Sequence, residues 1–377
     1  MRKFKAVLQQ GCEALVHRVL GHSEISTEWS PDLRFLIPIE SPEEHADVLR
    51  LQQAGLSNVA WTRSTSLERG DVVVPHASKG EISVLLRESD THHALFMTNR
   101  CNSHCLMCSQ PPTTTDDGWL VAEALDAIRH LRKSPRALGL TGGEPLLLGP
   151  GLRSVLDAVA QYHPRTQVEV LTNGRLLSQP QTASRTLEGL AAPVRWLVPL
   201  YGHADFVHDF VVQASGAFDE TLAGLLALQA RQQEIQLRVV LVEPVLQVLP
   251  ELAGFIARNL PFVREVALMG CEPIGFALAN RELCEVDLGE WSTTIEHGVR
   301  VLQRHGIPHL LMNVPLCALP RRLWPAAHRS ISDWKNTYAA ECEDCVVRED
   351  CSGLFAWYEK GWKPATLNPI RTKDAAA

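Results

Sequence analysis

The stretch ALFMTNRCNSHCLMC, residues 94–108, places a short apolar run directly before three cysteines. The apolar run at 94–99 predicts a buried strand, and the cysteines then lie in the loop that follows it. Cys101, Cys105 and Cys108 are separated by three residues and then by two. Three thiolates can hold a metal centre without completing its coordination, so the loop predicts a site with one open position.

Apolar runs and amphipathic helical stretches alternate from this strand onward to about residue 312. Strands that alternate with helices predict a parallel sheet with right-handed crossovers. Six such units followed by a different kind of segment predict an α/β fold, a partial (βα)6 barrel of TIM type at 91–313. The further strands are expected at 137–143, 167–174, 194–201, 235–244, 264–270 and 309–313.

The two flanks of this region have a different pattern. Residues 1–90 predict a small α+β domain of unknown role, with two strands within 70–89 and a helix at 41–55 that Ser41 caps. Residues 314–377 are rich in Pro, Trp and Cys, which is typical of a segment that a metal centre holds together.

Composition disfavours several classes of protein. The net charge of -7 gives no electrostatic footprint for nucleic acid, although it leaves room for a local basic patch, and no apolar stretch is long enough to span a membrane. The basic first residues lack the apolar core of a signal peptide, so we expect a cytoplasmic protein. Ten cysteines in such a protein favour metal binding or catalysis over disulfides.

A second motif, TGGEP at 141–145, ends the second predicted strand. Ligands of α/β barrels bind at the carboxyl ends of the strands, where Gly142 and Gly143 would let the backbone approach a ligand and Glu144 would add a carboxylate. Such a group suits a cationic amino group, although a lone GGEP is more often an ordinary turn. Asn173 ends the third strand and Arg238 lies in the fifth; a common turn and a solvent-facing side chain are their simpler explanations.

A second cysteine group lies in the C-terminal segment and comprises Cys317, Cys342, Cys345 and Cys351. Four thiolates can close a metal centre completely, and a structural zinc ion is the alternative to an iron–sulfur cluster. Cys271 follows the sixth strand, where a small buried thiol is the simpler interpretation and a ligand or radical-chemistry residue the functional one.

Together these motifs resemble those of the radical S-adenosylmethionine (SAM) superfamily. The resemblance implies that Cys101, Cys105 and Cys108 hold a catalytic [4Fe–4S] cluster whose open iron takes SAM. Gly142, Gly143 and Glu144 match the GGE motif that binds the SAM amino group, and Asn173 and Arg238 would lie near SAM. Met107 stands where the superfamily usually has an aromatic residue, and its thioether can still pack on an adenine. The C-terminal cysteines resemble a SPASM or Twitch segment with one auxiliary [4Fe–4S] cluster.

The stretches CNSHCLMCSQPP, LTGGEPLLLG and NVPLC and the segment 324–353 are similar to the C-type radical SAM maturase of the His-Xaa-Ser system. This resemblance implies an enzyme that cleaves SAM reductively to a 5′-deoxyadenosyl radical and modifies a His-Xaa-Ser repeat peptide, as in ribosomally made and post-translationally modified peptides (RiPPs). Its implied partners are that peptide, a second radical SAM maturase of the same system and an external electron donor. A radical SAM enzyme acting on RNA or a small molecule, and a non-enzymatic iron–sulfur electron carrier, remain alternatives.

Overall fold

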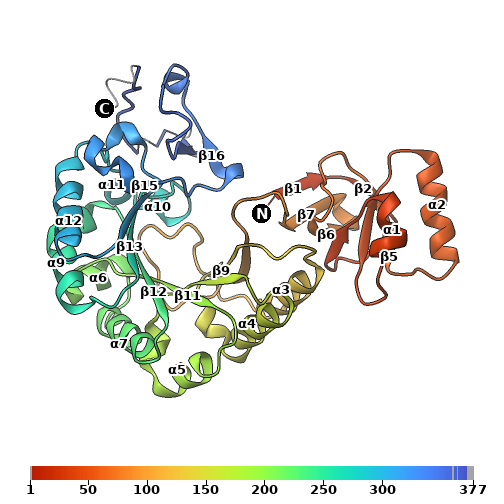
Figure 1. Cartoon of the computed structure of the whole chain (residues 1–377), viewed down its shortest axis with the longest axis horizontal. Helices are drawn as coiled ribbons and strands as arrows, with labels where there is room; N and C mark the ends of the chain where they lie inside the picture. The colour runs from red at the N-terminus through yellow and green to blue at the C-terminus, as the bar shows by residue number, and fades with distance from the viewer. Residues whose placement is uncertain (1, 359–360, 363, 372–377) are drawn as a thin grey trace.

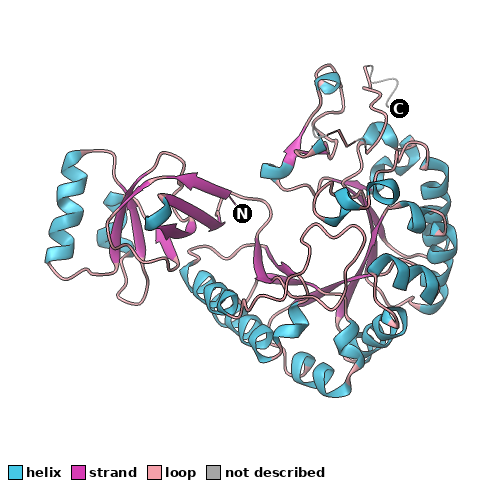
Figure 2. Cartoon of the chain, turned by 180° about the vertical axis from the view of Figure 1, so that it is seen from behind, coloured by secondary structure: helices cyan, strands magenta, loops and turns pink. Residues whose placement is uncertain are grey.

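The structure is a computed structural model that describes residues 2–358, 361–362 and 364–371. It has two lobes joined by a short linker, and the C-terminal segment lies on the larger lobe (Figure 1). The smaller lobe is a mixed sheet with few helices, and the larger lobe is a curved parallel sheet with helices along its outer side (Figure 2).

The N-terminal lobe is a seven-stranded sheet in the order β1-β7-β6-β3-β4-β5-β2. Its strands are β1 (Arg2–Lys5), β2 (Val7–Leu8), β3 (His17–Val19), β4 (Phe35–Pro38), β5 (Val59–Arg63), β6 (Val72–His76) and β7 (Glu81–Leu86), with helices α1 (Ile25–Glu28) and α2 (Pro42–Gln53). Ser41 caps α2, as expected, because its side chain accepts a hydrogen bond from the Glu44 backbone N–H at 3.1 Å. Alternating side chains of β4 fill both faces, with Phe35 in one apolar cluster and Leu36 in the other.

The larger lobe contains an eight-stranded sheet in which every pairing is parallel. Its strands follow chain order: β8 (Ala94–Thr98), β9 (Ala137–Gly142), β10 (Gln167–Leu171), β11 (Val194–Pro199), β12 (Glu234–Val240), β13 (Glu265–Met269), β14 (His309–Met312) and β15 (Ala327–His328). β8 and β15 are the two ends of the sheet, so the barrel is open on one side. The α/β fold class with a partial TIM-type barrel is therefore confirmed.

Helices follow most strands of this sheet and pack on its outer side (Figure 2). They are α3 (Trp119–His130), α4 (Pro150–Tyr162), α5 (Pro180–Leu187), α6 (Asp205–Val212), α7 (Ala217–Ala230), α8 (Glu243–Leu246), α9 (Leu249–Asn259), α10 (Phe276–Ala279), α11 (Arg281–Cys284) and α12 (Ser292–Arg304). Leu138, Val170 and Leu237 of these strands are fully buried.

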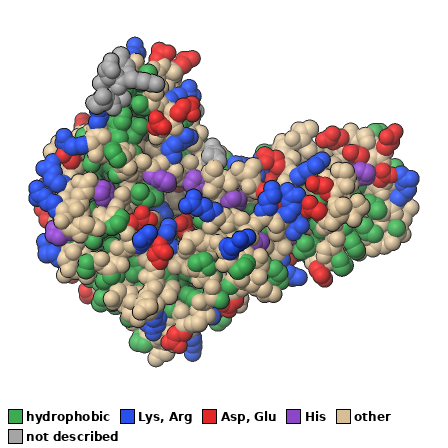
Figure 3. Space-filling model, in the orientation of Figure 1, with side chains coloured by type: hydrophobic (Ala, Val, Ile, Leu, Met, Phe, Trp, Pro, Cys, Tyr) green, Lys and Arg blue, Asp and Glu red, His purple; other side chains and the backbone are tan. Residues whose placement is uncertain are grey.

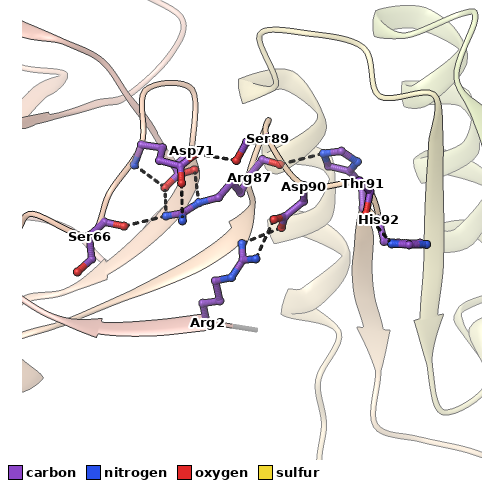
Figure 4. A network of polar contacts seen from close by, with 10 residues as sticks. Arg2, Ser66, Asp71, Arg87, Ser89, Asp90, Thr91 and His92 are labelled. Carbon is purple, nitrogen blue, oxygen red and sulfur yellow. Dashed lines mark hydrogen bonds and ion pairs between the residues drawn. The ribbon is translucent and has the colours of Figure 1, made fainter. Parts of the chain in front are cut away.

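The linker between the lobes is fixed by charged side chains (Figure 4). Arg2 of β1 pairs with both oxygens of Asp90 at 2.8 Å, and Arg87 binds the buried carboxylate of Asp71 at 2.8 and 3.0 Å. The N-terminal lobe also contacts the last turn of α3, where the Arg18 Nε–H donates to the His130 carbonyl at 2.6 Å. These contacts hold the N-terminal sheet beside the open side of the barrel.

The C-terminal segment continues past β14 through short helical turns. β15 adds to the barrel sheet, although it lies inside the segment expected to be separate, and β16 (Asn336–Thr337) pairs with β17 (Leu354–Phe355). The domain boundaries at residues 90 and 313 stay a prediction. No helix among the described residues is long and apolar enough to cross a membrane.

Candidate functional site

The three-cysteine loop lies at the carboxyl end of β8, and backbone hydrogen bonds hold it in place. The His104 and Leu106 N–H groups donate to carbonyls at the end of α6, at 3.0 and 2.9 Å. The Phe276 N–H donates to the Cys108 carbonyl at 2.8 Å. The loop is thus pinned on two sides by neighbouring elements, which fixes where its thiols point.

All three thiols of the loop are partly buried. Burial raises the pKa of Cys101 to about 11 and the pKa of Cys105 to about 12, and each neighbouring thiol adds to the rise. Raised pKa values disfavour free thiolates, whereas a bound metal cation favours thiolates and releases their protons. Three thiols held in one loop fit an iron–sulfur cluster with three protein ligands.

Gly142 and Gly143 are needed for a reason that the sequence did not reveal. A Cβ on Gly142 would lie 2.4 Å from the Thr98 carbonyl oxygen, and one on Gly143 would lie 2.1 Å from the Arg100 carbonyl oxygen. Gly142 also has a φ of 140°, which side chains rarely allow. The two glycines let the end of β9 contact the start of the cysteine loop, so they build the site whether or not they touch a ligand.

Glu144 is fully buried, and three donors occupy its carboxylate. Oε1 accepts from the Thr172 hydroxyl at 2.5 Å and the Leu146 N–H at 2.9 Å, and Oε2 accepts from the Asn173 N–H at 2.6 Å. Burial raises the pKa of Glu144 even though these bonds favour the ionised form. A carboxylate has about four acceptor positions, so one remains for a further donor such as an ammonium group.

We expect Glu144→Ala to weaken SAM binding by roughly 1.5–3 kcal/mol, and to lower the free energy of unfolding by a similar amount, because buried donors lose a charged acceptor. SAM binding is measured by calorimetry and unfolding by urea titration of the cluster-free protein. Iron content should stay at the wild-type value, because no thiol changes.

The matched control for this prediction is Glu123→Ala. Glu123 is a half-buried carboxylate on α3 without a hydrogen bond among the described residues, and burial raises its pKa as well. The control should leave both quantities nearly unchanged. An iron-free Glu144→Ala protein would show that Glu144 acts on cluster assembly instead.

Asn173 and Arg175 connect the end of β10 to the cysteine loop. The Asn173 side-chain amide donates to Asn102 Oδ1 at 2.6 Å and lies 4.0 Å from the Cys101 sulfur. The Arg175 guanidinium donates to the Asn102 carbonyl and, at 3.0 Å, to the Ser103 hydroxyl, while its Nε pairs with Glu220 at 2.6 Å. The TNG motif ends one residue before Arg175, and no motif marks this side chain, which contacts the loop between Cys101 and Cys105.

Arg175→Ala is expected to shorten the lifetime of the loop's cluster under chelator about tenfold. The loop would lose two hydrogen bonds from a charged donor, and such bonds contribute about 1.5–3 kcal/mol. The decay of the cluster absorbance under EDTA measures this. The control is Arg153→Ala, because Arg153 also donates to two backbone carbonyls, those of Glu188 and Gly189, far from the cysteines in sequence. Equal decay in the two variants would contradict a specific role for Arg175.

The other two predicted SAM contacts are Met107 and Arg238. Met107 lies in the cysteine loop itself, is 7% exposed and belongs to the main apolar core. Arg238 projects from β12, and its buried Nε has no hydrogen-bond partner among the described residues, while one Nη contacts the Met269 sulfur at 3.4 Å. A buried guanidinium with an unused donor suits an anionic group, such as a carboxylate of a bound ligand.

Tyr201 lies near this arginine and was not recognised in the sequence. Burial and the nearby thiols of Cys105, Cys108 and Cys271 raise the pKa of Tyr201 well above its ordinary value. Cys271 is buried, and its thiol interacts with that of Cys284, which contacts the Leu106 carbonyl at 3.7 Å. Cys271 is thus a buried thiol behind the cysteine loop, the simpler of its two expected roles.

The four C-terminal cysteines line one small pocket, together with Tyr338 and Arg348. The backbone N–H groups of Leu316 and Gly353 point at the Cys351 sulfur, at 3.4 and 3.5 Å. Donors aimed at a sulfur stabilise a thiolate, so these residues fit a second metal centre. Among the described residues, no group of three or more His, Cys, Asp or Glu side chains is placed to hold a single metal ion.

The C-terminal segment contacts the barrel mouth through Glu272, which directly follows Cys271. The Lys335 ammonium lies 2.9 and 3.2 Å from the two Glu272 oxygens, and the Trp357 indole N–H donates to the same carboxylate at 2.9 Å. The second cysteine group is thereby tied to the carboxyl end of the barrel strands.

The region around the first cysteine loop is similar to known proteins. The model of the radical SAM superfamily matches residues 95–246. A GTP 3′,8-cyclase of Streptomyces coelicolor is 32% identical over 135 residues, which cover 32% of this chain and 34% of that protein. A GTP 3′,8-cyclase of Mycobacterium ulcerans is 36% identical over 95 residues, 23% of this chain and 25% of that protein. The chain thus matches only about a third or less of the length of these relatives.

Solved structures give looser similarities. Streptococcus suis SuiB bound to S-adenosylmethionine has 11% identity and a TM-score of 0.46, over 58% of this chain and 49% of that one. A radical SAM methyltransferase from Sphaerobacter thermophilus has 16% identity and a TM-score of 0.44, over 66% and 71%. Scores this low say nothing about the substrate. Residues 95–246, which include the three cysteines at the carboxyl end of the first barrel strand, thus match the radical SAM superfamily.

Proposed function

We propose that this radical SAM enzyme modifies a peptide, as a maturase of RiPP type. The observation that carries the proposal is the four-cysteine segment, which Lys335 and Glu272 hold against the mouth of the barrel. Its spacing resembles that of auxiliary-cluster segments in peptide-modifying members of the superfamily. The His-Xaa-Ser system supplies the more specific form of the proposal, in which the substrate is a His-Xaa-Ser repeat peptide.

The residues of the chain have distinct roles in this proposal. Cys101, Cys105 and Cys108 would hold the catalytic [4Fe–4S] cluster, and the free acceptor position of Glu144 and the unused donor of Arg238 would orient the amino and carboxylate groups of SAM. The cluster and SAM, when both are bound and the cluster is reduced by one electron, would supply a 5′-deoxyadenosyl radical that takes a hydrogen atom from the substrate. The buried core around Tyr201 keeps water away from that end of the barrel.

The proposal includes further partners. An external electron donor has to supply the electron for SAM cleavage, and a second radical SAM maturase of the same system would act on the same peptide. Cys317, Cys342, Cys345 and Cys351 would bind an auxiliary [4Fe–4S] cluster that takes the returning electron or contacts the peptide. We place the enzyme in the cytoplasm, where its free thiols stay reduced.

A small-molecule substrate is the second candidate. It is supported by the 32% identity to a GTP 3′,8-cyclase, which makes GTP the substrate to test. The matched region covers 32% of the chain, whereas substrate selectivity in barrels depends on loops and appended segments throughout.

Co-expression with candidate repeat peptides, followed by mass spectrometry, tests the proposal. A mass change in the peptide that depends on Cys101, Cys105 and Cys108 supports a peptide maturase. Conversion of GTP by the purified enzyme, with an unchanged peptide, would favour the second candidate. An iron–sulfur protein that never consumes SAM when reduced would instead be an electron carrier.

A further inference from the structure

A cavity of about 620 Å³ lies between the N-terminal sheet and the open side of the barrel. Its walls come from β1, β7, β8, the start of α3, and Ser332, Trp334 and Lys335 of the C-terminal segment. In the space-filling view the surface is indented where the two lobes meet, and basic and histidine side chains gather near this junction (Figure 3). A volume of this size lies within the usual range of ligand sites, about 300–1,000 Å³.

The inner end of this cavity reaches the cysteine loop. Gln110 lines it, and the Gln110 carbonyl accepts a hydrogen bond from the Cys108 thiol at 3.1 Å. Thr141 also lines it and directly precedes Gly142 of the GGE motif. A molecule in the cavity would therefore extend from the N-terminal lobe to the edge of the proposed catalytic centre.

Two sheet edges border the same cavity. β1 pairs only with β7, and β8 pairs only with β9, within the strands that the structure describes. Arg2 and Lys3 of β1, and Ala94 and Phe96 of β8, line the cavity. An unpaired strand edge presents N–H and C=O groups that an extended chain can pair with.

The unpaired charges of the cavity are mainly positive. Arg2 is neutralised by Asp90, and Glu81 by Lys5 at 2.7 Å, whereas Lys3 and Lys79 form no ion pair with any described residue. Three histidines also line the cavity, His76, His92 and His93. Against these, Glu123 is a lining carboxylate without an ion pair in the described ranges. This balance favours an anionic occupant.

We propose that the cavity binds an acidic segment of the peptide substrate in extended form, as an added strand on the free edge of β1. The carboxylates of that segment face Lys3 and Lys79, and the chain beyond it continues toward the cysteine loop. This inference rests on the proposed function, since it assumes a peptide substrate. It assigns to the N-terminal lobe the recognition of a region outside the reacting residue.

Binding of defined probe peptides to the whole cluster-loaded protein tests this inference. The probe is a fluorescein-labelled ten-residue peptide of alternating Asp and Val, and its binding is measured by fluorescence anisotropy at low salt. The double variant Lys3→Glu and Lys79→Glu should weaken binding about tenfold or more, because two attractions become repulsions. The matched control reverses two exposed arginines elsewhere on the barrel, Arg185→Glu and Arg304→Glu, and should bind as the wild type does. A probe of alternating Lys and Val should bind weakly to the wild type and to the control, and more tightly to the double variant Lys3→Glu and Lys79→Glu, whose carboxylates attract it.

N-methylated probes test the strand pairing itself. Backbone groups of alternate residues point to opposite edges of a strand, so methylation of one alternate set should abolish binding and methylation of the other should not. Equal binding of both methylated probes would overturn the strand addition, and equal weakening by the two double variants would overturn the role of Lys3 and Lys79. If GTP binds the wild-type protein and no probe peptide does, the cavity would be a nucleotide site instead.

SAM cleavage by the wild-type protein separates this inference from the proposed function. If reduced wild-type enzyme forms no 5′-deoxyadenosine, the proposed function fails whatever the probes do. If it forms 5′-deoxyadenosine and modifies a peptide, but binds no acidic probe, only the inference about the cavity fails.

Discussion

Replacing Cys101, Cys105 and Cys108 together by Ala is expected to reduce 5′-deoxyadenosine formation to the background of the assay. The three thiols share one loop, and burial raises the pKa of Cys101 and Cys105 to about 11 and about 12. Without thiolates the catalytic cluster cannot form, and the one-electron chemistry that cleaves SAM is lost. The measurement is chromatography of anaerobic reactions with SAM and a reductant.

The control for this variant is Cys12→Ala, a partly buried cysteine of the N-terminal lobe outside both cysteine groups. It should form 5′-deoxyadenosine at the wild-type rate, which shows that the loss is specific to the loop. Full turnover by the triple variant would mean that the loop is not the catalytic site. Circular dichroism of both variants shows whether the loss comes from unfolding instead.

The barrel could be predicted from the sequence because its signal is local and repeated. Buried parallel strands are continuous apolar runs, and each of the seven expected strands overlaps an observed one, from β8 to β14. β15 was missed because a two-residue strand, Ala327–His328, has no periodicity to detect. The seven-stranded N-terminal sheet was predicted only in part, because its order joins strands that are distant in the chain, such as β1 with β7.

The candidate site shows the same division between local and long-range information. Spacing alone placed the three cysteines in one loop, and their position after β8 followed from the strand. The contacts that hold the loop come from Arg175, Val211 and Phe276, which lie 70 residues or more from Cys105 and carry no motif of their own. The sequence predicted Glu144 only as a ligand-binding carboxylate. The structure adds that Thr172 and Asn173, nearly thirty residues further along the chain, donate hydrogen bonds to it.

Asp117 illustrates what a sequence cannot show at all. Its buried carboxylate accepts from the Thr98 hydroxyl at 3.0 Å and from the Asn99 side chain at 3.1 Å, which fixes the end of β8 just before Cys101. In the sequence it is one of two adjacent aspartates in a loop, and nothing distinguishes it from Asp116. A single buried acceptor thus contacts the two residues at the end of β8, just before the cysteine loop.

The second large effect concerns metal content. The wild-type protein should contain about eight irons and no zinc, and the variant with Cys101, Cys105 and Cys108 replaced should retain about four, one cube. The reason is that Cys317, Cys342, Cys345 and Cys351 line one pocket and that two backbone N–H groups point at the Cys351 sulfur. Metal analysis by mass spectrometry, with Mössbauer spectroscopy for cluster type, measures both numbers.

The complementary variant replaces Cys342, Cys345 and Cys351 by Ala and should also contain about four irons. It should still cleave SAM, because the first loop is unchanged, and it should fail to modify a peptide if the second cluster takes part in that reaction. Its C-terminal segment should become more sensitive to protease, since a metal centre contributes folding energy directly to a segment with little core of its own. About four irons and one zinc in the wild type would instead show a structural zinc site, because four thiolates satisfy a tetrahedral ion as well as a cube. The protein could then still cleave SAM, but the C-terminal segment could not accept an electron, because zinc is not redox-active.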